Sequence, residues 1–199
     1  MHRRQFIQQT TAATSGILLL KRPFHEDPIL GQHGKRYRLN SQWGKLDFAR
    51  YPVKDCHEMV QDRQGRILLL TNETKNNVII YDKKGKLLTT WGTEYPGAHG
   101  LTLFDENGQQ VLFICDNNRH QVIKTTLDGR VLMTLDYPKE TGEYTKPEEY
   151  IPTETTIAAN GDIYVADGYG KDFVIQYDYQ GRYIRHFGGR GQGEEHLLN

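Results

Sequence analysis

Three residues that can bind a metal ion or move a proton occupy equivalent positions along the chain. His57 begins His-Glu-Met-Val, His99 begins His-Gly-Leu-Thr, and Glu154 lies in Pro-Thr-Glu-Thr-Thr. Neutral imidazole nitrogens hold zinc and similar metals, and a bound water can complete a catalytic site. The alternative is that the two histidines only form hydrogen bonds within a polar channel lining, and both interpretations stay open.

These positions are equivalent because the chain repeats one unit three times. Each unit has an apolar strand, a glycine turn, a second strand, a polar loop, a third strand and another glycine turn. The paired turn glycines lie 20, 21 and 20 residues apart: Gly65 and Gly85, Gly108 and Gly129, Gly161 and Gly181. Turns at this spacing between β-branched and aromatic runs predict an all-β fold.

The expected strands follow from these runs. Within the units they cover 67–71 and 78–81, 111–115 and 121–126, and 162–166 and 173–177, and a fourth strand follows at 86–91, 130–135 and 182–187. Four strands per repeat of roughly 40 to 50 residues is typical of a propeller blade. We therefore expect residues 31–199 to form a partial β-propeller, an incomplete ring with blades at about 56–92, 98–135 and 152–188.

Two further segments belong to this expected propeller. Residues 34–44 resemble 85–92, since both end in Trp-Gly, so we expect a lone outermost strand before the first blade. Residues 136–151 are polar and contain two prolines, which indicates a surface insertion between the second and third blades.

The N-terminus predicts export. Arg3-Arg4-Gln5-Phe6 precedes a mildly apolar stretch over 10–20, as in a twin-arginine signal, and we assign residues 1–30 to this signal and a linker. The stretch is too short to span a bilayer, for which about twenty residues are needed. No Ala-x-Ala cleavage site follows, so an uncleaved anchor stays open, and the expected location is periplasmic or extracellular.

Charge and cysteine content narrow the expected partners. Lys and Arg number 25, Asp and Glu number 25, and the basic residues are scattered, so nothing predicts nucleic-acid binding. Cys56 and Cys115 each fall in an expected strand and are interpreted as small buried residues rather than a disulfide.

Two of the repeats resemble a known family. The first carries His99-Gly100-Leu101 and then Asp116-Asn-Asn-Arg-His-Gln-Val122; the second carries Pro152-Thr-Glu154, Ile163-Tyr-Val-Ala-Asp-Gly-Tyr-Gly170 and Val174-Ile-Gln-Tyr177. These motifs resemble the peptidyl-α-hydroxyglycine α-amidating lyases, which are six-bladed NHL-repeat propellers. The resemblance covers about residues 56–199 and is strongest from His99 onward.

The resemblance implies a site and an activity. It places a zinc ligand at His99, a calcium-binding carbonyl at Leu101 and an active-site tyrosine at Tyr169; His57 is a further candidate ligand by position alone. The family's other two zinc histidines lie in later blades. The family also has an active-site arginine in its first blade, and this arginine has no counterpart near His57. Lys171-Asp172 stands where the family has Asn and Arg.

Three functions are therefore expected as alternatives. The first is metal-assisted C–N cleavage that releases a peptide amide and glyoxylate, with Tyr169 as acid, base or positioning group. The second is a non-catalytic propeller that binds a peptide, a glycan or a protein, in which Tyr169 is a loop aromatic. The third is a truncated chain with no function of its own. Asp116 and Asp167 are expected to form turns rather than to catalyse.

Overall fold

A computed structural model describes residues 29–197. The predicted export signal lies outside these residues, apart from its last two positions. The chain divides into two compact units, Met1–Ser41 and Gln42–Asn199. No helix in the described part is long and apolar enough to cross a membrane.

The described part of the first unit is a hairpin, in which β1 (Ile29–Leu30) pairs antiparallel with β2 (Tyr37–Arg38). Residues 34–44 therefore do not form the outermost strand that we expected. Gly31 and Gly34 both have positive φ angles and turn the chain back, so that residues 37 and 38 pair locally. The Trp-Gly end of the segment does follow the expected pattern, because Trp43 Nε1 donates a hydrogen bond to the carbonyl of Lys83.

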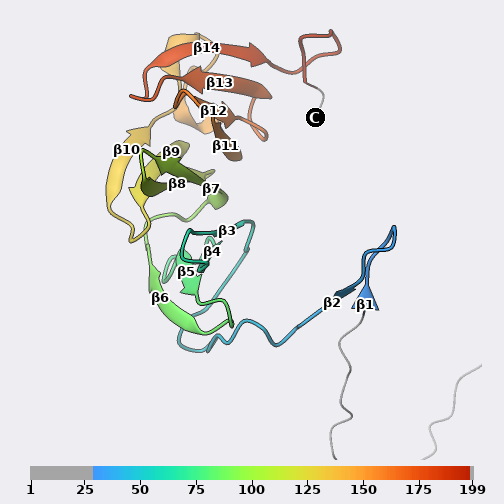
Figure 1. Ribbon diagram of the computed structural model, residues 1–199. Coiled ribbons are helices and arrows are strands. Elements are labelled where there is room, and N and C mark those ends of the chain that lie inside the picture. Colours follow the sequence, from blue (N-terminus) through green and yellow to red (C-terminus); the bar gives the residue numbers. More distant parts are fainter. Residues whose placement is uncertain (1–28, 198–199) are drawn as a thin grey trace, which may run out of the picture. The chain divides into compact units, whose positions relative to one another are not determined.

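The second unit contains three four-stranded antiparallel sheets, each in simple chain order (Figure 1). Their strands are β3 (Met59–Gln61), β4 (Ile67–Leu70), β5 (Val78–Tyr81) and β6 (Leu87–Trp91); β7 (Ala98–Glu106), β8 (Gln109–Asp116), β9 (Gln121–Thr126) and β10 (Val131–Leu135); and β11 (Glu154–Ile157), β12 (Ile163–Ala166), β13 (Phe173–Tyr177) and β14 (Tyr183–Gly188). The three predicted four-stranded blades are confirmed; most strand ends shift by one or two residues, and the first strand begins at Met59 rather than near residue 56.

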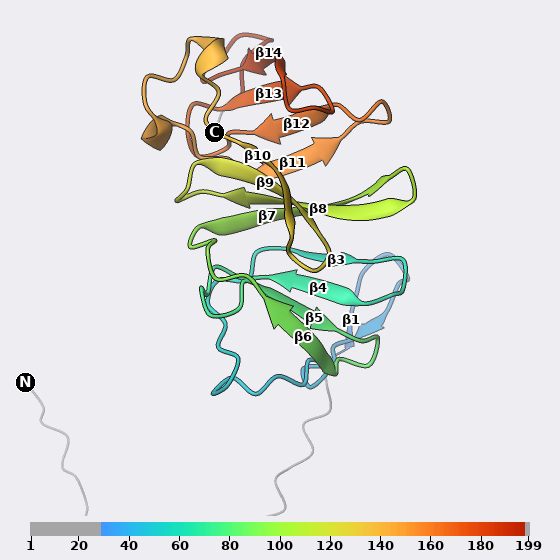
Figure 2. The same ribbon diagram turned by 90° about the vertical axis from the view of Figure 1, so that its left-hand side faces the viewer.

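The sheets pack face to face because both faces of the middle sheet are apolar. Figure 2 shows the three sheets following one another. In β8, Leu112 and Ile114 pack toward the first sheet, whereas Phe113 and Cys115 pack toward the third. Since neighbouring side chains in a strand point to opposite faces, a continuous apolar run is what a sheet buried on both sides requires.

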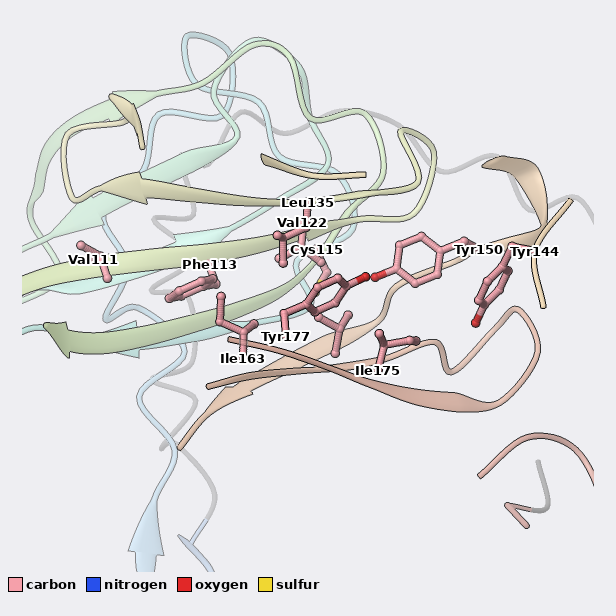
Figure 3. Packing of buried hydrophobic residues seen from close by; sticks show 11 residues of the cluster. Val111, Phe113, Cys115, Val122, Leu135, Tyr144, Tyr150, Ile163, Ile175 and Tyr177 are labelled. Carbon is pink, nitrogen blue, oxygen red and sulfur yellow. The ribbon is translucent and has the colours of Figure 1, made fainter. Parts of the chain in front are cut away.

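The insertion between β10 and β11 is less superficial than its polar sequence predicts. It contains two short 3₁₀ turns, Lys139–Thr141 and Pro147–Glu149. Tyr144 and Tyr150 are 5% and 0% exposed and extend the core between the second and third sheets (Figure 3). Two tyrosine rings of the insertion are buried in the core, although most of the residues around them in the sequence are charged or polar.

The two cysteines differ from each other. Cys115 is buried in β8 and Cys56 is exposed, and both thiols are free. The expected strand at Cys56 is wrong, because β3 begins only at Met59. The preceding segment bonds to a loop instead: Lys54 N donates to Thr71 Oγ1 and Asp55 N donates to Asn72 Oδ1.

An alanine substitution in the turn at Gly129 tests how closely the first and second sheets pack. Gly129 has φ +93°, and a Cβ atom there would lie 2.6 Å from Trp91 Cε3, whereas Gly108 has φ +91° and open space around it. We expect Gly108→Ala to cost about 1–2 kcal/mol from backbone strain alone, and Gly129→Ala to cost about 1–3 kcal/mol more from overpacking. Urea unfolding of both variants measures the difference, and equal losses would contradict the close packing.

Candidate functional site

The first strands of the three sheets lie side by side, with β7 in contact with both β3 and β11. This arrangement brings together the three candidate positions, since His57 precedes β3, His99 lies in β7 and Glu154 begins β11. The pairing register of β7 with β8 shifts between Ala98 and Leu101, which is where His99 lies. Such an irregularity changes the direction of a side chain relative to a regular strand.

The orientation of His99 is determined by a backbone carbonyl. Its Nδ1 atom lies 3.0 Å from the carbonyl oxygen of Thr153. A carbonyl only accepts hydrogen bonds, so Nδ1 carries the proton, and in the neutral ring Nε2 keeps its lone pair. Nε2 lies 3.3 Å from the hydroxyl of Tyr169, whose ring meets the imidazole edge-on with centroids 5.3 Å apart. His99 thus presents a basic nitrogen to the tyrosine hydroxyl.

Gly100 allows this contact. A Cβ atom at Gly100 would lie 2.4 Å from the Thr153 carbonyl oxygen and 3.2 Å from Glu154 Oε1. Any side chain at this position would therefore push β11 away from β7. The approach that lets His99 reach Thr153 requires glycine at residue 100.

His57 and Leu101 were also predicted to take part in metal binding. The ring of His57 stacks on that of His99, with centroids 4.1 Å apart and planes 27° apart. Imidazole lone pairs lie in the ring plane, so stacked rings direct them side by side rather than toward one point. Leu101 is buried in β7, and its side chain belongs to the core, so that only its main-chain carbonyl could bind calcium. Both assignments stay predictions.

A polar network that the sequence did not indicate joins β7 to β11. The hydroxyl of Thr102 lies 2.9 Å from Glu154 Oε1 and 2.7 Å from the carbonyl of Thr155. Burial and the neighbouring carboxylate of Glu154 both raise the pKa of Glu58. The two glutamates come from the first and third sheets, and spacing along the chain does not reveal their proximity.

Asp167 stabilises the loop that carries Tyr169 through hydrogen bonds. This carboxylate accepts hydrogen bonds from the main-chain N–H groups of Ile151 (2.7 Å) and Lys171 (2.7 Å) and from the hydroxyl of Tyr144 (2.6 Å). Tyr144 belongs to the insertion, which therefore supports the tyrosine loop. The side chain of Tyr169 itself is 58% exposed.

Asp116 stabilises the loop that follows β8 in the second sheet, as Asp167 stabilises the loop that follows β12 in the third. Its Oδ1 atom accepts hydrogen bonds from the main-chain N–H groups of Gly97, Asn118 and Arg119 at 2.9–3.1 Å. Asp116 and Asp167 are both fully buried, and burial raises the pKa of each carboxyl group. The geometry agrees with the prediction that both aspartates stabilise turns.

The charge change at Lys171 and Asp172 is compensated within the fold. Lys171 Nζ lies 2.9 Å from Glu149 of the insertion, and Arg190 Nε lies 2.9 Å from Asp172 Oδ2. The Lys171 ammonium also lies over the ring of Tyr144 at 5.5 Å from its centroid. Both residues therefore anchor the loop that carries Tyr169 rather than pointing a free charge at the site.

The groups that could bind a metal are few. Within residues 29–197, no group of three His, Cys, Asp or Glu side chains could hold a metal ion. His99 fits the requirements of a single zinc ligand, because a hydrogen bond to the Thr153 carbonyl fixes Nδ1 and leaves the lone pair on Nε2, beside the Tyr169 hydroxyl. Near the first strands of the sheets, the described residues thus provide the oriented Nε2 of His99 and the neighbouring Tyr169.

Comparisons with known proteins find relatives of one kind. The chain is 28% identical over 156 residues to peptidyl-alpha-hydroxyglycine alpha-amidating lyase 1 of Drosophila melanogaster, a match that covers 76% of this chain and 26% of that protein. It is 30% identical over 115 residues to a probable peptidyl-alpha-hydroxyglycine alpha-amidating lyase of Caenorhabditis elegans, covering 57% of this chain and 31% of that protein. The chain matches no protein-family model.

Solved structures show the same fold at lower identity. A streptogramin B lyase superposes with a TM-score of 0.52 at 14% identity, covering 72% of this chain and 44% of that one. A virginiamycin B lyase from Staphylococcus aureus gives a TM-score of 0.50 at 15% identity, covering 70% and 43%. The predicted propeller fold and the resemblance to amidating lyases are confirmed at low identity. The chain spans less than a third of the length of the curated relatives it matches.

Tyr144→Phe tests the support of the tyrosine loop. Losing a hydrogen bond to a buried carboxylate is expected to lower the free energy of unfolding by about 1.5–3 kcal/mol at neutral pH. The Tyr144 hydroxyl stabilises the ionised form of Asp167 and so opposes the rise that burial imposes on its pKa. The loss should therefore shrink as the pH falls through the pKa of Asp167. Tyr179→Phe, at a 56% exposed tyrosine, is the control for urea unfolding at several pH values; a pH-independent loss contradicts the assignment.

Proposed function

We propose that this chain is the part of an exported propeller lyase that recognises and cleaves peptides ending in α-hydroxyglycine. One observation carries the proposal: the Nε2 atom of His99 faces the hydroxyl of Tyr169 at 3.3 Å, and these are the two residues whose side chains the family resemblance places at the active site. The similarity to two amidating lyases supports the same reaction class. The chain spans only part of the length of those relatives. That it performs their reaction is therefore a proposal.

The chemistry that these residues can perform is proton transfer. Cleavage removes the proton of the α-hydroxyl group, forms the carbonyl of glyoxylate, breaks the bond from the α-carbon to the amide nitrogen, and places a proton on that nitrogen. Nε2 of His99 is the base available for the hydroxyl proton, and the hydroxyl of Tyr169 is the acid available for the leaving nitrogen. The carbonyl of Thr153 keeps the imidazole in the tautomer that accepts a proton at Nε2.

Zinc and calcium are the ions that the resemblance implies. A zinc ion would supply polarisation of the α-hydroxyl group, and Nε2 of His99 is the atom that would hold it. Because Nε2 has one lone pair, holding zinc and accepting the hydroxyl proton are alternative roles of this atom. The main-chain carbonyl of Leu101 is the group assigned to calcium. Because one histidine does not complete a zinc site, the proton-transfer steps above use only groups of this chain.

A second candidate is peptide binding without chemistry. Tyr169 is 58% exposed and His57 is also exposed, so the site presents aromatic surface next to the carboxyl groups of Glu58 and Glu154. Such a surface can hold a peptide through stacking and hydrogen bonds. Peptide binding that persists without turnover would favour this function.

The catalytic proposal is tested with a peptide that ends in α-hydroxyglycine. The chain is expected to release glyoxylate and peptide amide, His99→Ala to lower kcat/KM by about 100-fold or more, and Tyr169→Phe to lower it by about 10- to 100-fold, because each removes a proton-transfer group. His196→Ala and Tyr179→Phe are matched controls at exposed positions. Measuring glyoxylate with and without added zinc reveals any metal requirement. Turnover unaffected by His99→Ala, in a variant with unchanged circular dichroism, overturns the assignment.

Export is proposed from the twin arginines of the N-terminal segment. Residues 1–30 placed before a folded reporter should direct it out of the cytoplasm of a bacterium that has a twin-arginine pathway. Replacing Arg3 and Arg4 together by lysine should abolish export, whereas Arg22→Lys should leave it unchanged. Reporter activity in the periplasmic fraction is the measurement, and equal export of the double variant contradicts the proposal.

A further inference from the structure

Each of the three sheets has an outer turn that packs against the segment preceding the sheet, and we call these three contacts junctions; the side chain supplied by that segment differs at the third junction. The outer turn of each sheet rests on a side chain from the segment before it: a Cβ atom at Gly129 would meet the ring of Trp91, and one at Gly181 would meet Leu135 Cδ2 at 2.8 Å. Trp91 pairs with Val78 across β5 and β6, and Leu135 pairs with Val122 across β9 and β10. Leu135 is thus the register equivalent of Trp91.

The tryptophans do more than fill space at these junctions. Trp91 Nε1 donates a hydrogen bond to the carbonyl of Leu127 (3.0 Å), and Trp43 Nε1 donates one to the carbonyl of Lys83 (3.3 Å). Lys83 and Leu127 are the second residues of equivalent turns, and Tyr179 is the second residue of the third turn. Leu135 is smaller than an indole and has no N–H group to donate to that turn.

A pocket of about 490 Å³ lies at this third junction. Leu135 and Gly181 form part of its lining, so it lies against the residues that replace the tryptophan contact. Its volume falls within the range of about 300–1,000 Å³ that is usual for small-molecule sites. The insertion supplies another wall, with Tyr137 and Pro138.

Three of the ten residues that line this pocket are tyrosines, and its net charge is negative. Tyr137, Tyr177 and Tyr183 line it together with Asp136 and Glu140. Asp136 Oδ1 also accepts a hydrogen bond from Gln121 Nε2 at 2.7 Å. Arg182 also lines the pocket, but its guanidinium Nε is bonded to Asp178 Oδ2 at 2.6 Å. Burial raises the pKa of Tyr177, and the negative charges of Glu140 and Asp136 raise it further.

We infer that this junction pocket, at the outer rim between the second and third sheets, binds an aromatic group that carries a positively charged amine. The aromatic part packs beside Leu135, which is smaller than the indole at the other two junctions, and the ammonium group faces Asp136 and Glu140. An aromatic amine combines ring contacts with a charge interaction that neither part supplies alone. The pocket is separate from His99 and Tyr169, so this inference does not depend on the proposed lyase activity.

Leu135→Trp is the direct test, because it supplies the indole from within the chain. Tryptamine, titrated into the full chain by isothermal calorimetry, should bind, and its Kd should rise at least tenfold in Leu135→Trp. That variant should also melt at a higher temperature, since the new indole can bond to the third turn as Trp91 does to the second. Leu132→Trp, on the same strand at an exposed leucine outside the pocket lining, should leave both values unchanged.

A second pair of measurements isolates the charge. Indole-3-acetate, which has a carboxylate in place of the amine, should bind at least tenfold more weakly than tryptamine. Asp136→Asn combined with Glu140→Gln should weaken tryptamine binding by a similar factor, with Glu148→Gln as the control. This double variant preserves the packing, so it decides the question even if Leu135→Trp does not fold. Absent tryptamine binding, or equal affinity for the two indoles, overturns the inference.

Discussion

The close approach of β7 to β11 is the contact on which the candidate site depends. Gly100 leaves room for the backbone of Thr153, and the hydroxyl groups of Thr102 and Thr155 lie 2.7 Å apart across the two strands. A polar contact between neighbouring sheets is stable only where its partners are satisfied within the fold. Because the close approach brings the Thr153 carbonyl to Nδ1 of His99, the imidazole is held in one tautomer and one direction.

The insertion between the second and third sheets gives the tyrosine loop its support. Asp167 accepts hydrogen bonds from the insertion and from the loop, so a single buried carboxylate joins the two. Lys171 and Glu149 add an ion pair between the same segments. A long connection between sheets thereby becomes part of the structure around Tyr169, although its own residues lie outside the group that could transfer protons.

The repeat also explains where the structure departs from regularity. Two junctions carry a tryptophan, and the third has Leu135 beside a pocket of about 490 Å³, larger than the pocket of about 290 Å³ that lies beside Trp91. The hydrophobic repeat continues through all three, since leucine keeps the apolar character of the position. The side chain of Leu135 is smaller than that of tryptophan and cannot donate a hydrogen bond, and a hydrophobic pattern does not distinguish the two residues.

The sequence by itself determined the three four-stranded sheets, because turn glycines and apolar runs recur at a constant spacing and specify local hairpins. It also indicated His99 and Tyr169 through motifs. The strands predicted at Cys56 and at residues 34–44 are wrong, because these short segments form local hydrogen bonds with neighbouring loops or strands instead. Only the tertiary structure decided that His57 stacks on His99, that Glu58 meets Glu154, and that Tyr144 binds Asp167. These contacts join different sheets or a loop to a sheet, and their geometry depends on how close the backbones pack rather than on spacing along the chain.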